Sequence, residues 1–297
     1  MASTKEIKER MSGVRETKQI TNAMYLVAST KLRHAREALD HTRPYFDALR
    51  TEIVKVFRAD EQVVSRYFYD ADGTLPDRGV CGILAITGDK GLAGAYNMNV
   101  IRRTEAALKE NPGARLFVMG EYGRRYFHSH HVPIEEDFLY SAQITTLDQA
   151  RDIGTLLLGL YDNAELDQIL VIYTDMQSSL SASAITHRLL PLERASFAKA
   201  AAEASPEGPA DYEFVPSQEA VLDAVMRSYL SGFIYSATVD SLCSEQNARV
   251  TAMEAAGRNA EELLSDLSLQ LNRERQSAIT QEITEISAGA KAQRSKK

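Results

Sequence analysis

The sequence predicts an α/β protein, with a central Rossmann-like α/β domain joined to a long antiparallel coiled coil formed by the N- and C-terminal helices. Two of the supporting observations concern the ends of the chain, because residues 3–43 and residues 217–297 contain no proline. The third concerns the centre, where residues 81–192 alternate apolar, strand-like runs with amphipathic helical segments. Such alternation is typical of helices layered on parallel strands.

The N-terminal segment has the heptad spacing of a coiled coil. Its seam, meaning the positions that would face a partner helix, steps alternately by four and three residues: Ile7, Met11, Val14, Lys18, Thr21, Tyr25, Ala28, Leu32, Ala35 and Leu39. Most of these residues are apolar, as a packed helix pair requires. We therefore assign residues 1–58 to an N-terminal coiled-coil helix, of which residues 3–43 would span on the order of 60 Å.

The C-terminal segment has the same spacing, at Leu242, Gln246, Arg249, Met253, Ala256, Ala260, Leu263 and Leu267. The apolar stripe then drifts through Leu271, Ile279, Ile283 and Ile286, which indicates a period nearer to 3.6 than to 3.5 residues and a shallow supercoil. We assign residues 217–297 to a C-terminal coiled-coil helix; residues 217–287 alone would span roughly 105 Å. Because this helix is the longer one, antiparallel pairing would leave part of it as a single helix.

The central Rossmann-like domain is assigned to residues 78–195. Strands are expected at 81–87, 115–120, 168–175 and 181–192, and helices at 96–113 and 145–167. Residues 196–216 are rich in Ala, Pro and Glu, so we predict a linker or surface loop there.

Composition narrows the classes of function. The net charge of −7 and the absence of an aromatic and basic platform disfavour a nucleic-acid partner. Residues 1–50 nevertheless hold ten Lys/Arg against six Asp/Glu. A solvated helix face is the preferred explanation of this balance, and an acidic partner surface is the alternative. The two cysteines have no CxxC partner, so a cysteine-based zinc site is not expected.

The stretch ITGDKGLAGAYN at residues 86–97 raises the alternative of a Rossmann-like nucleotide-dependent enzyme with helical oligomerisation arms. Its glycines follow a predicted strand and are Gly88, Gly91 and Gly94. Lys90 is followed by Gly91 rather than by Ser or Thr, so the P-loop motif is incomplete, and the glycine spacing GxxGxxG differs from GxGxxG. Asp89 would also repel a phosphate. We interpret the stretch as a tight turn between a strand and a helix.

Other candidates for chemistry are weaker still. The HSHH stretch at 128–131 cannot direct three imidazoles at one ion from a regular element, and the serines at 178–183 form no GxSxG elbow. We therefore predict no catalytic residue, no bound cofactor and no metal site. A coiled-coil scaffold that only spaces domains remains a third reading.

Segments along the whole chain carry a family resemblance. The sequence ITQEITEISAGAKA at 279–292 is similar to the C-terminal signature of the gamma subunit of F-type ATP synthases of the bacterial type. Residues 5–33 resemble that family's first helix, and SEQNARVTAM at 244–253 resembles its second. The turn TGDKGLAGAYN at 87–97 and LLPL at 189–192 also fit its pattern.

This resemblance implies a rotor. In the family, the coiled coil runs through a ring of alpha and beta subunits, while the globular domain lies against the epsilon subunit and the membrane c-ring. Ion-driven rotation of the c-ring turns the asymmetric shaft, which changes the conformation of the catalytic sites during ATP synthesis or hydrolysis. The chain would then be a non-catalytic subunit of a proton-transporting ATP synthase complex, peripheral on the cytoplasmic face of the cell membrane.

The resemblance also implies partner-binding residues. Met24 matches the family's position beside an acidic loop of the beta subunit. A cluster in the C-terminal helix matches positions at the same level and consists of Glu245, Gln246 and Arg249. Polar residues near the top of the shaft match positions that meet beta-subunit loops, and they are Arg275, Gln276, Thr280, Glu282 and Glu285. Tyr212 falls in the stretch that faces epsilon and the c-ring.

Overall fold

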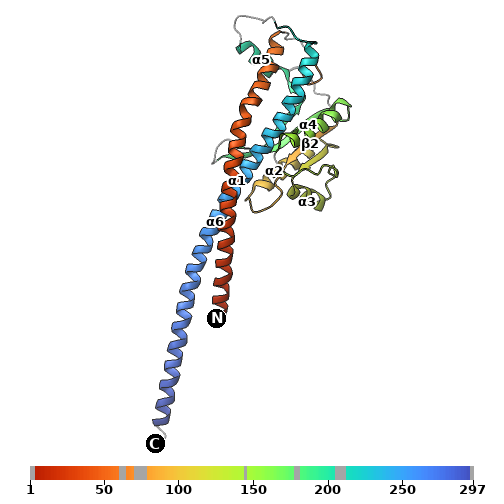
Figure 1. The fold of residues 1–297 in the computed structure, drawn as a ribbon. Coiled ribbons are helices and arrows are strands. Elements are labelled where there is room, and N and C mark those ends of the chain that lie inside the picture. Colours follow the sequence, from red (N-terminus) through yellow and green to blue (C-terminus); the bar gives the residue numbers. More distant parts are fainter. Residues whose placement is uncertain are drawn as a thin grey trace. The chain divides into compact units, whose positions relative to one another are not determined.

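The computed structural model describes residues 4–59, 65–69, 79–143, 146–176, 181–204 and 212–294 (Figure 1). These residues form two compact units, Met1–Ala28 with Arg249–Lys297, and Ser29–Ala248. Two long helices, α1 (Thr4–Ala59) and α6 (Gln218–Arg294), contribute to both units. None of the described helices contains an apolar segment of the length and charge content that a bilayer crossing requires.

In the first unit, α1 and α6 pack antiparallel along the predicted seam. Ile7 and Met11 are buried against Leu267. Lys18 is a polar seam residue, and its Nζ atom lies 2.7 Å from Oε1 of Glu261 on α6. The polar interruption of the heptad pattern therefore forms an ion pair across the helix pair. Tyr25, also assigned to the seam, is instead 36% exposed.

The longer helix extends past the shorter one in this unit. The last residues of α6 that pack with the start of α1 are Leu267 and Leu271. From Asn272 to Gly289 every residue is exposed except Glu274, which is half-buried. Figure 1 shows the end marked C lying beyond the end marked N along these helices. This single-helix segment, residues 272–294, is the overhang expected from the unequal helix lengths.

In the second unit, the same two helices pack again and meet the α/β domain. Leu32 and Ala35 of α1 form a buried cluster with Val239 and Cys243 of α6. The helix α1 also passes through Pro44, which is exposed. A proline costs a helix one backbone hydrogen bond, and here it does not end the element.

The sheet of the α/β domain has the strand order β3-β2-β4-β5. Its strands are β2 (Cys81–Ile86), β3 (Arg115–Met119), β4 (Gln168–Met176) and β5 (Ala182–Leu190). The strand β2 is parallel to both β3 and β4, as the alternating pattern predicts. The strand β5 is antiparallel to β4, so the prediction of parallel strands was wrong there. Five residues separate the two strands, whereas a parallel return needs a crossover of a dozen or more.

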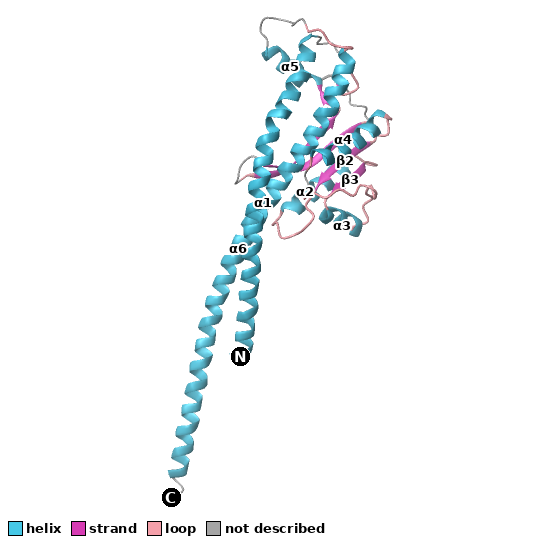
Figure 2. Ribbon diagram, in the orientation of Figure 1, coloured by secondary structure: helices cyan, strands magenta, loops and turns pink. Residues whose placement is uncertain are grey.

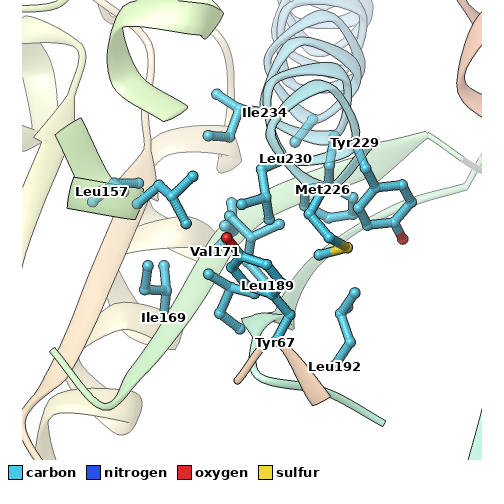
Figure 3. Packing of buried hydrophobic residues seen from close by; sticks show 14 of the residues in the cluster. Tyr67, Leu157, Ile169, Val171, Leu189, Leu192, Met226, Tyr229, Leu230 and Ile234 are labelled. Carbon is cyan, nitrogen blue, oxygen red and sulfur yellow. The ribbon is translucent and has the colours of Figure 1, made fainter. Parts of the chain in front are cut away.

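Helices cover both faces of this sheet (Figure 2). On one face, α2 (Tyr96–Glu110) and α3 (Glu121–Ser129) pack against Ile83 and Ala85 of β2. On the other face, α4 (Leu147–Asp162) and α6 pack against Leu84 and Ile86. Figure 3 shows this second core, where Leu157, Leu230 and other apolar side chains converge. Because both faces are covered, every residue of β2 is buried.

Three further elements were not predicted. The strands β1 (Phe68–Tyr69) and β6 (Leu192–Glu193) form a two-stranded parallel sheet. The helix α5 (Arg194–Ala204) occupies the start of the segment predicted as a linker, so that prediction was wrong for these residues. Phe197 of α5 contacts Phe57 and Phe68 at centroid distances of 6.0 and 5.6 Å. Burial of this ring gives the segment a packed face that holds it as a helix.

Candidate functional site

The single-helix segment of α6 carries an exposed apolar stripe. Ile279, Ile283 and Ile286 are 45%, 60% and 72% exposed. Their spacing of four and three residues places them on one face of the helix. Such a stripe on an otherwise polar helix is typical of a surface that a partner covers.

The polar residues predicted near the top of the shaft lie on this same segment, and all are exposed: Arg275, Gln276, Thr280, Glu282 and Glu285. Thr280 and Glu285 make hydrogen bonds to residues four positions away on the same helix. The Thr280 hydroxyl donates to the backbone carbonyl of Gln276 at 2.9 Å, and the Gln281 amide donates to Glu285 Oε1 at 3.0 Å. The segment therefore presents polar and apolar side chains together.

A second exposed apolar group surrounds Met24 on α1. Met24 itself is half-buried. Its helix neighbours Ile20, Leu26 and Val27 are 61%, 65% and 58% exposed. The heptad spacing places Ile20, Met24 and Val27 beside the seam as apolar surface, and the resemblance singles out Met24 among them. The structure adds that Ile20 and Val27 are exposed.

The cluster predicted on the C-terminal helix is buried instead of exposed. In the second unit, Glu245 and Gln246 are each 1% exposed. In the first unit, Arg249 is 7% exposed. Their burial follows from the register, because Gln246 and Arg249 occupy seam positions. These side chains are in contact with the rest of the chain, so they do not form an open surface.

Glu245 packs against the glycine turn between β2 and α2. A methyl group placed at Gly88 would lie 2.9 Å from Cδ and Oε1 of Glu245. The Gly88 backbone amide donates to Oδ1 of Asn97 at 2.8 Å. The side-chain amide of Asn97 donates in turn to the Lys90 carbonyl at 3.2 Å. The turn is thus closed by the protein's own side chains, and a side chain at Gly88 would require the Glu245 carboxylate to shift.

The next residue in the turn, Asp89, holds the neighbouring loop. Its Oδ1 accepts from the Glu121 amide at 3.1 Å and from the Ala142 amide at 3.3 Å. Its Oδ2 accepts from the Ser141 hydroxyl at 2.5 Å and from the Gln143 amide at 3.3 Å. In the sequence, Asp89 stands out only as a negative charge. The structure shows a carboxylate fully engaged in four hydrogen bonds.

The loop held by Asp89 also contacts α1. The Lys31 ammonium donates to Oε1 of Gln143 at 3.1 Å. This contact and the Asp89 hydrogen bonds form a continuous polar link from the ends of β2 and β3 to one long helix.

The end of β4 is joined to the other long helix. The Thr174 amide donates to the Ser241 hydroxyl at 3.3 Å, and the Ser244 hydroxyl donates to the Thr174 carbonyl at 3.4 Å. Together with Glu245, these contacts occupy the carboxyl edge of the sheet. In open α/β sheets this edge is where ligands bind. Here it is used to fasten the α/β domain to the long helices.

We therefore expect the purified full chain to show no ATP binding at the glycine turn. The measurement is calorimetric titration with ATP, with and without Mg²⁺, at protein concentrations that detect micromolar affinity. Micromolar binding that is lost in Gly88→Val but kept in Gly91→Ala would contradict this interpretation. Gly91 serves as the control because an added methyl group there meets only a Tyr122 side-chain atom, at 3.7 Å.

The remaining candidates show no sign of chemistry. His130 stacks on Tyr126 at 4.0 Å and its Nδ1 lies 2.8 Å from the Tyr126 carbonyl oxygen. Within the described residues no group of His, Cys, Asp and Glu could hold a metal ion. Burial raises the pKa of Cys81 to about 11 and that of Cys243 to about 12. Both cysteines therefore stay as unreactive thiols at neutral pH.

Tyr212 contacts the last turn of α1 in the second unit. Its side chain is 38% exposed. The Arg58 guanidinium donates to its hydroxyl at 3.3 Å and lies 5.8 Å from its ring centroid. Arg58 of α1 therefore holds the ring, which stays partly exposed.

Comparisons with known proteins agree with these features. The sequence model of the family described as ATP synthase matches residues 3–293. The ATP synthase gamma chain of Caldanaerobacter subterraneus is 40% identical over 292 residues, covering 96% of this chain and 98% of that one. The ATP synthase gamma chain of Acetivibrio thermocellus is 38% identical over 297 residues, covering 98% and 99%.

A solved structure shares the fold. It is a chain of the Euglena gracilis mitochondrial ATP synthase, in a structure of OSCP, F1 and c-ring. The TM-score is 0.66 at 19% identity, over 97% of this chain and 94% of that chain. The paired long helices and the mixed α/β domain thus recur at low sequence identity.

Proposed function

This chain belongs to the family of ATP synthase gamma chains, and from that premise we propose how its surfaces serve as the central rotor shaft of an F-type ATP synthase. The shaft couples ion-driven rotation of a c-ring to conformational change at the catalytic sites of an alpha/beta ring. It contributes no catalytic residue itself. The observation that carries the proposal is the single-helix segment 272–294, whose exposed apolar stripe needs a surrounding partner.

The single-helix segment is the part of the shaft that turns inside the ring. One helix with an apolar stripe and a polar opposite face presents a different surface in each direction. Each surrounding subunit therefore meets a different face as the helix rotates, so equivalent catalytic sites adopt different conformations in turn. The contact residues on this segment are Arg275, Gln276, Thr280, Glu282 and Glu285, with the isoleucine stripe between them.

Met24 and the exposed residues around it form a second contact, with an acidic loop of a beta subunit. The positive balance of residues 1–50 favours such a partner. The buried Glu245, Gln246 and Arg249 act indirectly, because their packing fixes the long helices. Apolar and weakly charged surfaces suit a bearing, since a tight orientation-specific ion pair would stop rotation.

The α/β domain receives torque from the c-ring and the epsilon subunit, on the side where Tyr212 is exposed. The links through Asp89, Glu245 and Ser241 pass this torque to the long helices. The complex places the chain on the cytoplasmic face of the cell membrane as a peripheral protein.

Reconstitution tests this function. We expect ATP hydrolysis by matching alpha and beta subunits to rise when the full chain is added, because the shaft makes the catalytic sites unequal. In the same assay Ile283→Asp should lower this stimulation at least tenfold, since a charge on the stripe must lose its water on contact. Ser277→Asp on the same segment is the control and should retain it. Equal hydrolysis with and without the chain would refute the rotor role.

A further inference from the structure

A cleft of about 440 Å³ lies in the second unit between β5, β6, α5 and α6. Arg50 of α1 and Arg188 of β5 both line it, together with Glu193 and His187. Its lining includes no residue of the turn at Gly88 and none of the residues assigned to the shaft contacts. None of its residues has a role in the function proposed above.

Among the described residues, the two arginines have no carboxylate counter-ion. Within the described residues, neither Arg50 nor Arg188 lies within salt-bridge distance of a carboxylate, and Glu193 in the same wall pairs with neither. Arg188 Nε is buried and has no hydrogen-bond partner there. A buried donor without a partner is energetically costly, so an anionic oxygen that accepts this hydrogen bond would stabilise the site.

Aromatic contacts hold the polar side chains of the cleft in place. The Arg188 guanidinium lies 5.3 Å from the ring centroid of Tyr69. The His187 ring stacks on Phe233 at 4.4 Å with an interplanar angle of 23°. Burial lowers the pKa of His187, so at neutral pH this ring supplies a neutral hydrogen-bonding group instead of a charge. The positive charge in the cleft comes from its two guanidinium groups.

We propose that this cleft binds a phosphate group, held by the guanidinium groups of Arg50 and Arg188. A planar guanidinium presents paired donors that match two phosphate oxygens, which a lysine cannot do. The Ser196 hydroxyl already donates to the Glu193 carbonyl at 2.8 Å, so its oxygen still has lone pairs but no spare proton. The anion is therefore held by the arginines.

The volume of the cleft limits the size of the molecule to which the phosphate group belongs. About 440 Å³ exceeds the needs of a free phosphate ion and is within the range of small-molecule sites. The phosphate group therefore belongs either to a small soluble phosphate or to the headgroup of an anionic phospholipid. Both sources use the same two arginines.

The test is titration of the full chain with inorganic phosphate, followed by calorimetry and by the rise in melting temperature. We expect saturable binding, weakened about tenfold or more in Arg188→Gln and in Arg50→Gln. Arg50 is exposed, so its replacement keeps the fold even if Arg188→Gln lowers stability. The control Arg125→Gln removes an equal charge from α3, outside the cleft, and should bind phosphate like the wild type.

A second arm separates the sources. Vesicles of phosphatidylcholine with phosphatidylglycerol, and vesicles of phosphatidylcholine alone, are floated with the chain. Selective flotation with phosphatidylglycerol that needs Arg50 and Arg188 assigns a headgroup; phosphate binding without flotation assigns a soluble ligand. The net charge of −7 makes non-specific attraction to anionic vesicles unfavourable.

The proposal is overturned by either of two results. One is the absence of both phosphate binding and selective flotation in the wild type. The other is an equal loss of binding in Arg125→Gln, which would show an adventitious ion only.

Discussion

Replacing Gly120 with alanine is expected to lower the free energy of unfolding by about 3 kcal/mol or more. Gly120 follows β3 and has a φ of +94° and a ψ of 135°, a conformation that L-residues rarely adopt. A methyl group there would lie 2.2 Å from the Thr87 carbonyl oxygen and 2.9 Å from that of Gly88. Both obstacles are backbone atoms, so no side-chain rotation relieves the contact.

Gly113→Ala is the matched control for this prediction. Gly113 also has a positive φ, +84°, but nothing lies within 4 Å of an added methyl group. Its substitution should cost only conformational strain, on the order of 1 kcal/mol. The measurement is urea unfolding followed by circular dichroism. Equal midpoints for the two variants would show that the close approach of the β2 and β3 ends does not limit stability.

Asp89→Ala is expected to lower the free energy of unfolding by roughly 2–4 kcal/mol. The substitution removes the acceptor of four hydrogen bonds and leaves the amides of Glu121, Ala142 and Gln143 without that partner. Asp89→Asn retains one carbonyl oxygen as an acceptor, so an intermediate loss should follow. Asp137→Ala is the control, because Asp137 is exposed and its change should be within about 0.5 kcal/mol of zero.

Amide hydrogen exchange measures where the same variants lose local stability. Loss of Asp89 should speed amide exchange at residues 141–143 and near Lys31, since the polar link to α1 is then broken. In membranes that hold the complete synthase, Asp89→Ala should lower ATP synthesis, because torque must pass from the α/β domain to the long helices. Unchanged exchange at residues 141–143 would mean that other contacts hold this loop.

The long helices could be predicted because their signal is periodic and local. Ile7, Met11 and Leu267 follow the heptad spacing, and the structure buries all three. The parallel strands around β2 could be predicted for a similar reason, since a fully buried strand is a continuous apolar run. The resemblance of the chain ends to a known family then supplied the function.

Features that depend on contacts distant in sequence could not be predicted. The burial of Glu245 against Gly88 depends on how α6 meets the sheet, and neither segment alone indicates it. The antiparallel direction of β5 is the exception, because the short connection from β4 already indicates it. The alternation of strand and helix patterns does not. The helix α5 begins as an alanine-rich segment whose order depends on Phe197 packing with Phe57 and Phe68.

Rotation of the chain within the assembled complex tests the central claim most directly. Both native cysteines are buried, so Lys109→Cys, at an exposed position on α2, gives a single accessible thiol for a visible probe. With the alpha/beta ring fixed to a surface, we predict continuous rotation of the probe in one direction while ATP is hydrolysed, and none without ATP. A probe that stays fixed relative to the ring during sustained hydrolysis would contradict the account.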